Sequence, residues 1–101
     1  MNEQKKCLVT EAMEILGKKW VIIILYHLLS GPKRFYQLED DTDASGRLLS
    51  ERLKELEAAG MVTRTIYAEV PPRVEYQMTE KGREVEPIIR EIYAWASKWL
   101  V

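Results

Sequence analysis

The sequence predicts an α+β domain that is mostly α-helical, from three observations. Apolar residues recur at helical spacing along most of the chain and alternate with polar residues only between about Val62 and Met78. Helical spacing returns after that segment. A chain of 101 residues, 47% of them hydrophobic and 31% charged, has the size and composition of one folded domain, residues 1–101.

Four helices are expected ahead of the alternating segment. Gly17 separates the first from the second, and the run "SGP" from Ser30 to Pro32 stops the second. The fourth has an apolar stripe at Leu49, Leu53 and Leu56, and Gly60 ends it. The expected ranges are Leu8–Leu16, Trp20–Leu29, a short helix within Lys33–Asp41, and Ser45–Ala59.

A two-stranded hairpin and a last helix follow. The alternation of Val62–Ala68 and that of Val74–Met78 predict two strands, joined by "EVPPR". From Glu80 onward the spacing is helical, and Pro87 either kinks this helix or marks the first turn of its second half.

A short helix, a polar turn, a longer capped helix and a hairpin are typical of a winged helix-turn-helix. The major groove of DNA, about 12 Å wide, accepts one helix, while the hairpin reaches the backbone or the neighbouring minor groove. The sequence therefore predicts that the fourth helix is a recognition helix and that the hairpin is a wing, flanked by N- and C-terminal helices.

The polar face of the predicted recognition helix supplies candidate DNA contacts. If the leucine stripe faces the core, Arg47, Glu51 and Lys54 lie opposite it, with Leu48 and Ser50 on the flanks. Arginine can pair with guanine, serine with a base or phosphate, leucine with a thymine methyl group and glutamate with a cytosine amino group. Arg52 lies nearer the core, where it is expected either to contact a phosphate or to form an ion pair within the protein. The predicted DNA-binding residues are Lys33, Arg34, Ser45, Arg47, Leu48, Ser50, Glu51, Lys54 and Arg73.

The proline pair in the hairpin suggests a rigid tip. Pro71 and Pro72 favour an extended turn that presents Arg73 beside the recognition helix, where the minor groove concentrates negative potential. Alternatively, the prolines with Glu69 and Glu75 protect a strand edge from aggregation.

Charge leaves a second function open. The formal net charge is −1, and five carboxylates between Glu39 and Glu51 oppose phosphate binding. A solvated helix face with alternating charges is common. The alternative to a DNA-binding regulator is therefore a winged-helix protein-interaction module without DNA binding. Neither an enzyme motif nor a set of metal ligands is visible, so no catalytic activity and no cofactor are expected.

The two ends of the chain predict a homodimer and a candidate sensor. Apolar residues cover more of the end helices than one small core can bury, which favours a second copy as partner. Cys7 follows Lys5 and Lys6, which would stabilise a thiolate, or else it is a small buried hydrophobe. A lone cysteine and a short apolar run at Trp20–Leu29 favour a cytoplasmic protein without a membrane segment. The predicted dimer residues are Leu8, Ile88, Ile92, Trp95 and Trp99.

Several short motifs in order give the chain a family resemblance. They are Gly17 with Lys19-Trp20, Arg34-Phe35, Leu49-Ser50 with Arg52-Leu53 and Leu56, and "PPRVEYQMTEKG" from Pro71 to Gly82. With these motifs the chain resembles the HxlR-type winged helix-turn-helix transcriptional regulators, relatives of the MarR group. The resemblance implies a prokaryotic homodimer that binds a palindromic operator, and an oxidant- or electrophile-sensing role for Cys7. By position it also implies a recognition helix at 45–59 and a wing at 61–79.

Overall fold

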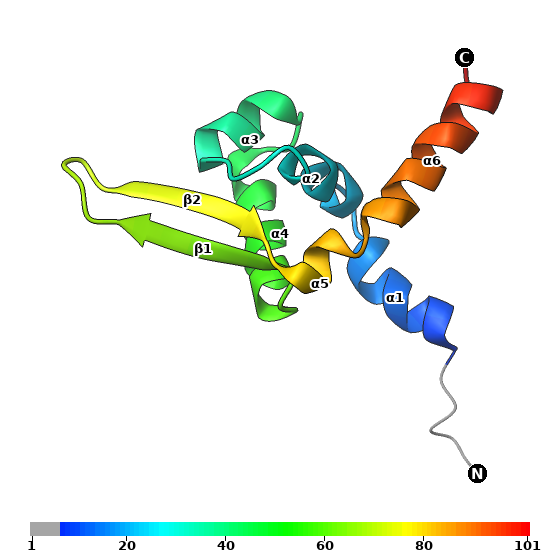
Figure 1. The fold of residues 1–101 in the computed structure, drawn as a ribbon, viewed down its shortest axis with the longest axis horizontal. Helices are drawn as coiled ribbons and strands as arrows, with labels where there is room; N and C mark the ends of the chain where they lie inside the picture. Colours follow the sequence, from blue (N-terminus) through cyan, green and yellow to red (C-terminus); the bar gives the residue numbers. More distant parts are fainter. Residues whose placement is uncertain (1–6) are drawn as a thin grey trace, which may run out of the picture.

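The computed structural model describes residues 7–101, which form six helices and one hairpin (Figure 1). The hairpin projects from one end of the molecule, and α1 and α6 project from the other. This arrangement confirms the predicted α+β, mostly α fold. The elements are α1 (Leu8–Leu16), α2 (Val21–Leu28), α3 (Phe35–Asp41), α4 (Gly46–Ala58), β1 (Val62–Tyr67), β2 (Arg73–Met78), α5 (Glu80–Arg83) and α6 (Glu86–Trp99).

Helix α2 begins one residue later than predicted, and α3 lies within the range predicted for it; each start has a visible reason. Trp20 has a φ of 79°, a left-handed conformation that a right-handed helix cannot contain, so α2 starts at Val21. Lys33 is extended and exchanges two backbone hydrogen bonds with Tyr76, of 2.9 and 2.7 Å, so α3 starts at Phe35. The hydrogen bonds between Lys33 and Tyr76 attach the segment before α3 to the edge of β2 that is not paired with β1.

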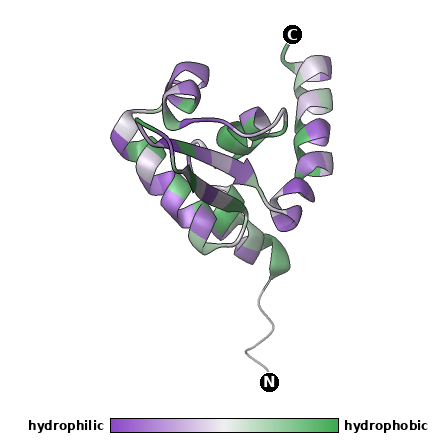
Figure 2. Ribbon diagram, turned by 60° about the vertical axis from the view of Figure 1, so that its left-hand side comes forward, coloured by the Kyte–Doolittle hydropathy of each residue, from purple (hydrophilic) through white to green (hydrophobic). Residues whose placement is uncertain are grey.

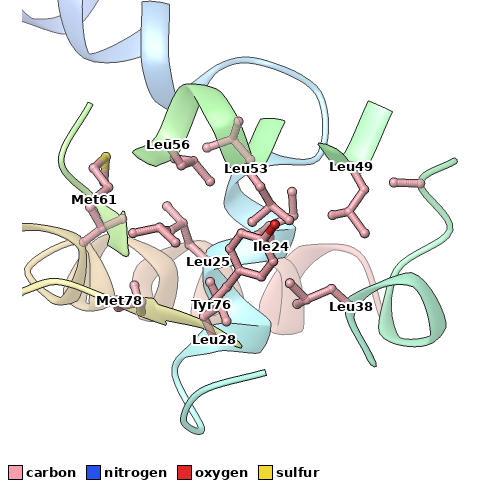
Figure 3. Close-up of a cluster of buried hydrophobic side chains, with 14 of the residues drawn as sticks. Ile24, Leu25, Leu28, Leu38, Leu49, Leu53, Leu56, Met61, Tyr76 and Met78 are labelled. Atoms are coloured by element: carbon pink, nitrogen blue, oxygen red, sulfur yellow. The ribbon is translucent and has the colours of Figure 1, made fainter. Parts of the chain in front are cut away.

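The core is built around α2 and α4 (Figure 3). The predicted stripe of Leu49, Leu53 and Leu56 is buried, with at most 1% of each residue exposed. Leu38 of α3 and Tyr76 of β2 pack into the same cluster. Burial of these apolar side chains is the main source of stability in such a small domain, and it holds α4 against the body of the protein.

The hairpin register defines two faces of the wing. The antiparallel pairs Val62↔Met78 and Arg64↔Tyr76 lie on one face, and Tyr67↔Arg73 lies on the other. The first is the inner face, because Val62, Tyr76 and Met78 on it are buried in the core shared with α2 and α4. The other is the outer face, and it also carries Thr65 and Glu75.

The last helical segment is divided into α5 and α6, and Pro87 lies in the first turn of α6. Of the two roles predicted for Pro87, the second is therefore confirmed. The Thr79 hydroxyl accepts a hydrogen bond from the Gly82 N–H at 3.1 Å and donates one to the Gly60 carbonyl at 2.6 Å. Gly82 packs directly on the Met61 backbone, where a Cβ atom would collide with the Met61 carbonyl. This contact connects the start of the wing to α5, the short helix that precedes α6.

Candidate nucleic-acid interface

The start of α4 is set by Ser45. Its backbone is extended, and its hydroxyl accepts a hydrogen bond from the Leu48 N–H at 3.2 Å. This is the N-cap interaction, which satisfies one of the free donors in the first helical turn. Ser45 is exposed, so its hydroxyl sits at the surface beside the first turn of α4.

The polar face of α4 is open to solvent as predicted. Arg47, Glu51 and Lys54 are exposed, while Leu48 and Ser50 are half-buried on the flanks. The Arg47 side chain is 92% exposed, and its Nε lies 3.9 Å from a Glu51 carboxylate oxygen. An exposed pair at that distance contributes little to stability, so Arg47 is free to turn toward a ligand.

Of the two roles predicted for Arg52, a phosphate contact or an ion pair within the protein, the structure shows the second. Its Nε donates to the Lys19 carbonyl at 2.9 Å, and its guanidinium pairs with Glu55 at 3.3 Å. Glu55 also pairs with Lys18 at 3.4 Å. These contacts attach the middle of α4 to the turn between α1 and α2.

Lys33 and Arg34, the two basic residues before α3 that were predicted to contact DNA, differ in whether a carboxylate neutralises their charge. Lys33 donates to the Asp41 carboxylate at 2.8 Å, and this hydrogen bond lowers the pKa of Asp41. Arg34 is exposed at the N-cap of α3, where its backbone N–H donates to Gln37 at 2.8 Å. Within residues 7–101 no carboxylate lies within 4.0 Å of the Arg34 guanidinium, so Arg34 presents more charge than Lys33.

The acidic turn stands next to this surface. Glu39, Asp40 and Asp43 are exposed, and in the described part of the chain only Asp41 among residues 39–43 has an ion-pair partner. The turn therefore keeps most of its negative charge, which opposes an approaching phosphate backbone.

Arg73 lies in a different place from the one expected. It is on the outer face of the wing, whereas the sequence predicted that it would stand beside the recognition helix. Its guanidinium pairs with Glu69 and Glu75, both at 3.0 Å, and stacks 4.0 Å above the Tyr67 ring. The strand register decides this position, because it brings Tyr67 directly opposite Arg73.

Arg64 was not among the predicted contacts. It is exposed on the inner face of the wing, on the side where Val62 packs into the core with α4. No carboxylate in residues 7–101 lies within 4.0 Å of it. The signal was present in the sequence, since Arg64 alternates in phase with the buried Val62.

Cys7 is exposed in a single copy of the chain, so it is not a buried hydrophobe within the core of one subunit. The side-chain hydrogen bond with Thr10 lowers the pKa of the thiol, and hydrogen bonds with the backbone of Thr10 and Val9 act in the same direction. Lys5 and Lys6, the predicted source of this effect, lie outside the described residues.

The apolar faces of the terminal helices lack partners in a single copy of the chain. No residue of α1 is buried, and in α6 only Ile89 is buried. Figure 2 shows α6 standing apart from the body with hydrophobic and hydrophilic residues intermixed along it. The predicted dimer residues are all exposed: Leu8, Ile88, Ile92, Trp95 and Trp99. Within residues 7–101, no helix has the length and apolar character needed to cross a membrane.

Comparison with known proteins agrees with this architecture. The model of the HxlR-like helix-turn-helix family matches residues 15–101. The HTH-type transcriptional regulator YvaP of Bacillus subtilis is 46% identical over 102 residues, which cover 99% of this chain and 94% of YvaP.

Two solved structures are similar over nearly the whole chain. The redox regulator HypR in its oxidized form has a TM-score of 0.86 and 40% identity, covering 91% of this chain and 96% of HypR. The reduced form of the transcriptional regulator YodB from B. subtilis has a TM-score of 0.80 and 36% identity, covering 98% of this chain and 94% of YodB. The chain therefore belongs to the HxlR-like helix-turn-helix family of DNA-binding transcriptional regulators.

Proposed function

We propose that this regulator binds a palindromic operator as a homodimer in the cytoplasm of a prokaryotic cell. In each subunit α4 enters the major groove, and the wing contacts the backbone or the neighbouring minor groove. The observation that carries the proposal is the exposed face of α4, on a helix whose opposite face is locked in the core. A rigidly held helix with a free polar face is what base recognition requires.

The exposed side chains of α4 suggest how bases are distinguished. Arg47 lies in the first turn with an almost fully exposed guanidinium, suited to the two acceptors of a guanine edge. Ser50 and Leu48 flank it, available to a base or phosphate and to a thymine methyl group. Glu51 would accept from a cytosine amino group, and its weak contact with Arg47 leaves both side chains free to reach the bases.

The dimer forms through the terminal helices. Trp95 and Trp99 are more than half exposed on α6, and Leu8 is 78% exposed on α1. Along α6 a shallow apolar groove is lined by Pro87, Ile88, Glu91, Ile92 and Trp95. Such a surface on a protein of this size favours a self-complementary interface with two-fold symmetry. A two-fold dimer can place two recognition helices about 34–36 Å apart, one turn of DNA.

Selection of bound fragments from random DNA by the purified protein tests the proposal. We expect a palindromic site whose binding weakens steeply as KCl rises from about 50 to about 200 mM. If no fragment is retained even at about 50 mM, the protein-interaction alternative is favoured, with the acidic turn or the wing as its docking surface.

Arg47→Ala is expected to relax the preference for one base pair in each half-site by about 1–3 kcal/mol, because a bidentate contact with guanine is lost. Competition binding with single-base variants of the selected site measures this. Arg83→Ala is the control, since Arg83 is an exposed arginine on α5, which contacts the C-terminal end of α4 and not the first turn that carries Arg47. Unchanged discrimination at every position would remove Arg47 from base recognition.

A thiol-based response is a second proposal, favoured by the exposed Cys7 at the start of α1. The similar protein HypR is described as a redox regulator. Because α1 carries exposed apolar residues assigned to the dimer, an oxidised or alkylated Cys7 would alter that contact and with it the spacing of the recognition helices.

Thr10→Val is expected to raise the pKa of Cys7, because the hydroxyl that stabilises the thiolate is removed. The thiolate fraction at neutral pH then falls, and alkylation by iodoacetamide becomes slower. The pH profile of the alkylation rate measures the shift, with Thr10→Ser as the control that keeps the hydroxyl. Identical profiles for the wild type and Thr10→Val would show that Thr10 does not activate the thiol.

A further inference from the structure

The wing carries two arginines and two carboxylates, and the structure divides them unequally between its faces. The charged residues of the segment 61–79 are Arg64, Glu69, Arg73 and Glu75. In the hairpin register Arg64 lies opposite Tyr76 on the inner face, and Arg73 lies opposite Tyr67 on the outer face. The two arginines therefore point to opposite sides of the hairpin.

Arg73 is fully engaged within the wing. Glu69 and Glu75 approach its guanidinium to 3.0 Å each, and the Tyr67 ring covers it at 4.0 Å. The side chain is 28% exposed, and its Nε is shielded from solvent. This group of one cation and two carboxylates has a net charge of −1, so the outer face repels a phosphate.

Arg64 has the opposite surroundings. Both carboxylates of the wing are held by Arg73, and no other carboxylate of residues 7–101 lies within 4.0 Å of Arg64. It is exposed, and it follows the buried Val62 by two residues on the same face, roughly 7 Å further along the strand. Arg64 therefore lies on the face of the hairpin that packs, nearer the base of the wing, into the core shared with α2 and α4.

We propose that Arg64 is the residue through which the wing binds a DNA phosphate, and that Arg73 is a positioning residue that keeps the hairpin stiff. This inference rests on the proposed DNA binding of α4. When α4 lies in the major groove, the wing that follows it in the chain lies close to the DNA backbone, and Arg64 is the arginine of the wing without an ion-pair partner in residues 7–101. An unpaired guanidinium there forms charge-assisted hydrogen bonds with a phosphate without first breaking an ion pair.

The salt dependence of binding tests this assignment. The probe is a fluorescein-labelled duplex of the site that the wild type selects, with anisotropy measured between about 50 and about 200 mM KCl. Arg64→Gln is expected to reduce the slope of log K against log [KCl] by about 0.9 for each subunit, while the order of preference among DNA sequences stays unchanged. Between about 50 and about 200 mM KCl, the wild-type dimer is therefore expected to lose roughly tenfold more affinity than the Arg64→Gln dimer.

Three variants separate the roles of the two arginines. Arg64→Lys is expected to keep the wild-type slope, because a lysine still neutralises one phosphate. Arg73→Gln is expected to keep the slope and to lower the melting temperature, because the ion pairs within the wing are lost. Arg83→Gln, which removes an exposed arginine from α5, should change neither quantity.

Two results would overturn the inference. One is a salt slope for Arg64→Gln that equals the slope of the wild type. The other is a slope that Arg73→Gln reduces and Arg64→Gln does not. A wild-type protein that binds no DNA at about 50 mM KCl would instead refute the proposed function from which the inference starts.

Discussion

Replacing Trp95 by alanine is expected to give a folded monomer that binds its operator about 10²- to 10⁴-fold more weakly than the wild type. Trp95 is 58% exposed on α6 and lies outside the buried cluster, so the fold of one subunit does not depend on it. A buried tryptophan at an interface, by contrast, commonly supplies a large share of the binding free energy. In the dimer, binding of one half-site holds the second subunit close to the other half-site, at a high effective concentration. A monomer lacks this advantage, so its affinity for the operator falls by the same factor.

Sedimentation and operator binding measured on the same samples check this expectation. Ser97→Ala is the matched control, because at 100° per residue Ser97 lies on the opposite side of α6 from Trp95. A Trp95→Ala protein that remains a dimer would remove this face of α6 from the interface. A monomer with full affinity would show that dimerisation is not needed for operator binding.

Leu53→Ala is expected to lower the free energy of unfolding by about 2–5 kcal/mol. Leu53 is 1% exposed in the middle of α4, where it packs among the side chains of α2 and the wing. The loss is large against the roughly 5–15 kcal/mol that stabilises a typical domain, and it loosens the helix that carries the DNA contacts.

Urea denaturation at a fixed protein concentration measures the change, because the stability of a dimer depends on concentration. Leu53→Met keeps most of the volume and is expected to cost less than about 1.5 kcal/mol. If Leu53→Ala cost no more than Leu53→Met, α4 would not be held by this leucine stripe.

Helix α4 and the hairpin were predictable because their signals are local. The leucines at positions 49, 53 and 56 share one helical face whatever surrounds them, and Ser45 and Gly60 mark the ends by their own backbone preferences. The ends of α2 and α3 were less predictable. The bridge between Lys33 and Tyr76 joins distant parts of the chain, and the left-handed conformation of Trp20 follows from no local residue preference.

The candidate site divides in the same way. The exposure of Arg47, Glu51 and Lys54 follows from helical geometry once the leucine stripe is buried. The surroundings of Arg73 do not follow from any local pattern, because its two carboxylate partners and Tyr67 come together only when the strands pair in one register.

By itself the sequence determined the order of the elements, the polar face of α4, the apolar character of the terminal helices and the family, because spacing and motifs along the chain encode them. Only the tertiary structure decided which face of the wing packs into the core with α4, and therefore that Arg64 lies exposed on that face while Arg73 is held by Glu69 and Glu75 on the other. The physical reason is that alternation along a strand separates two faces without saying which one is buried. That choice is made when the inner face packs into the core with α2 and α4.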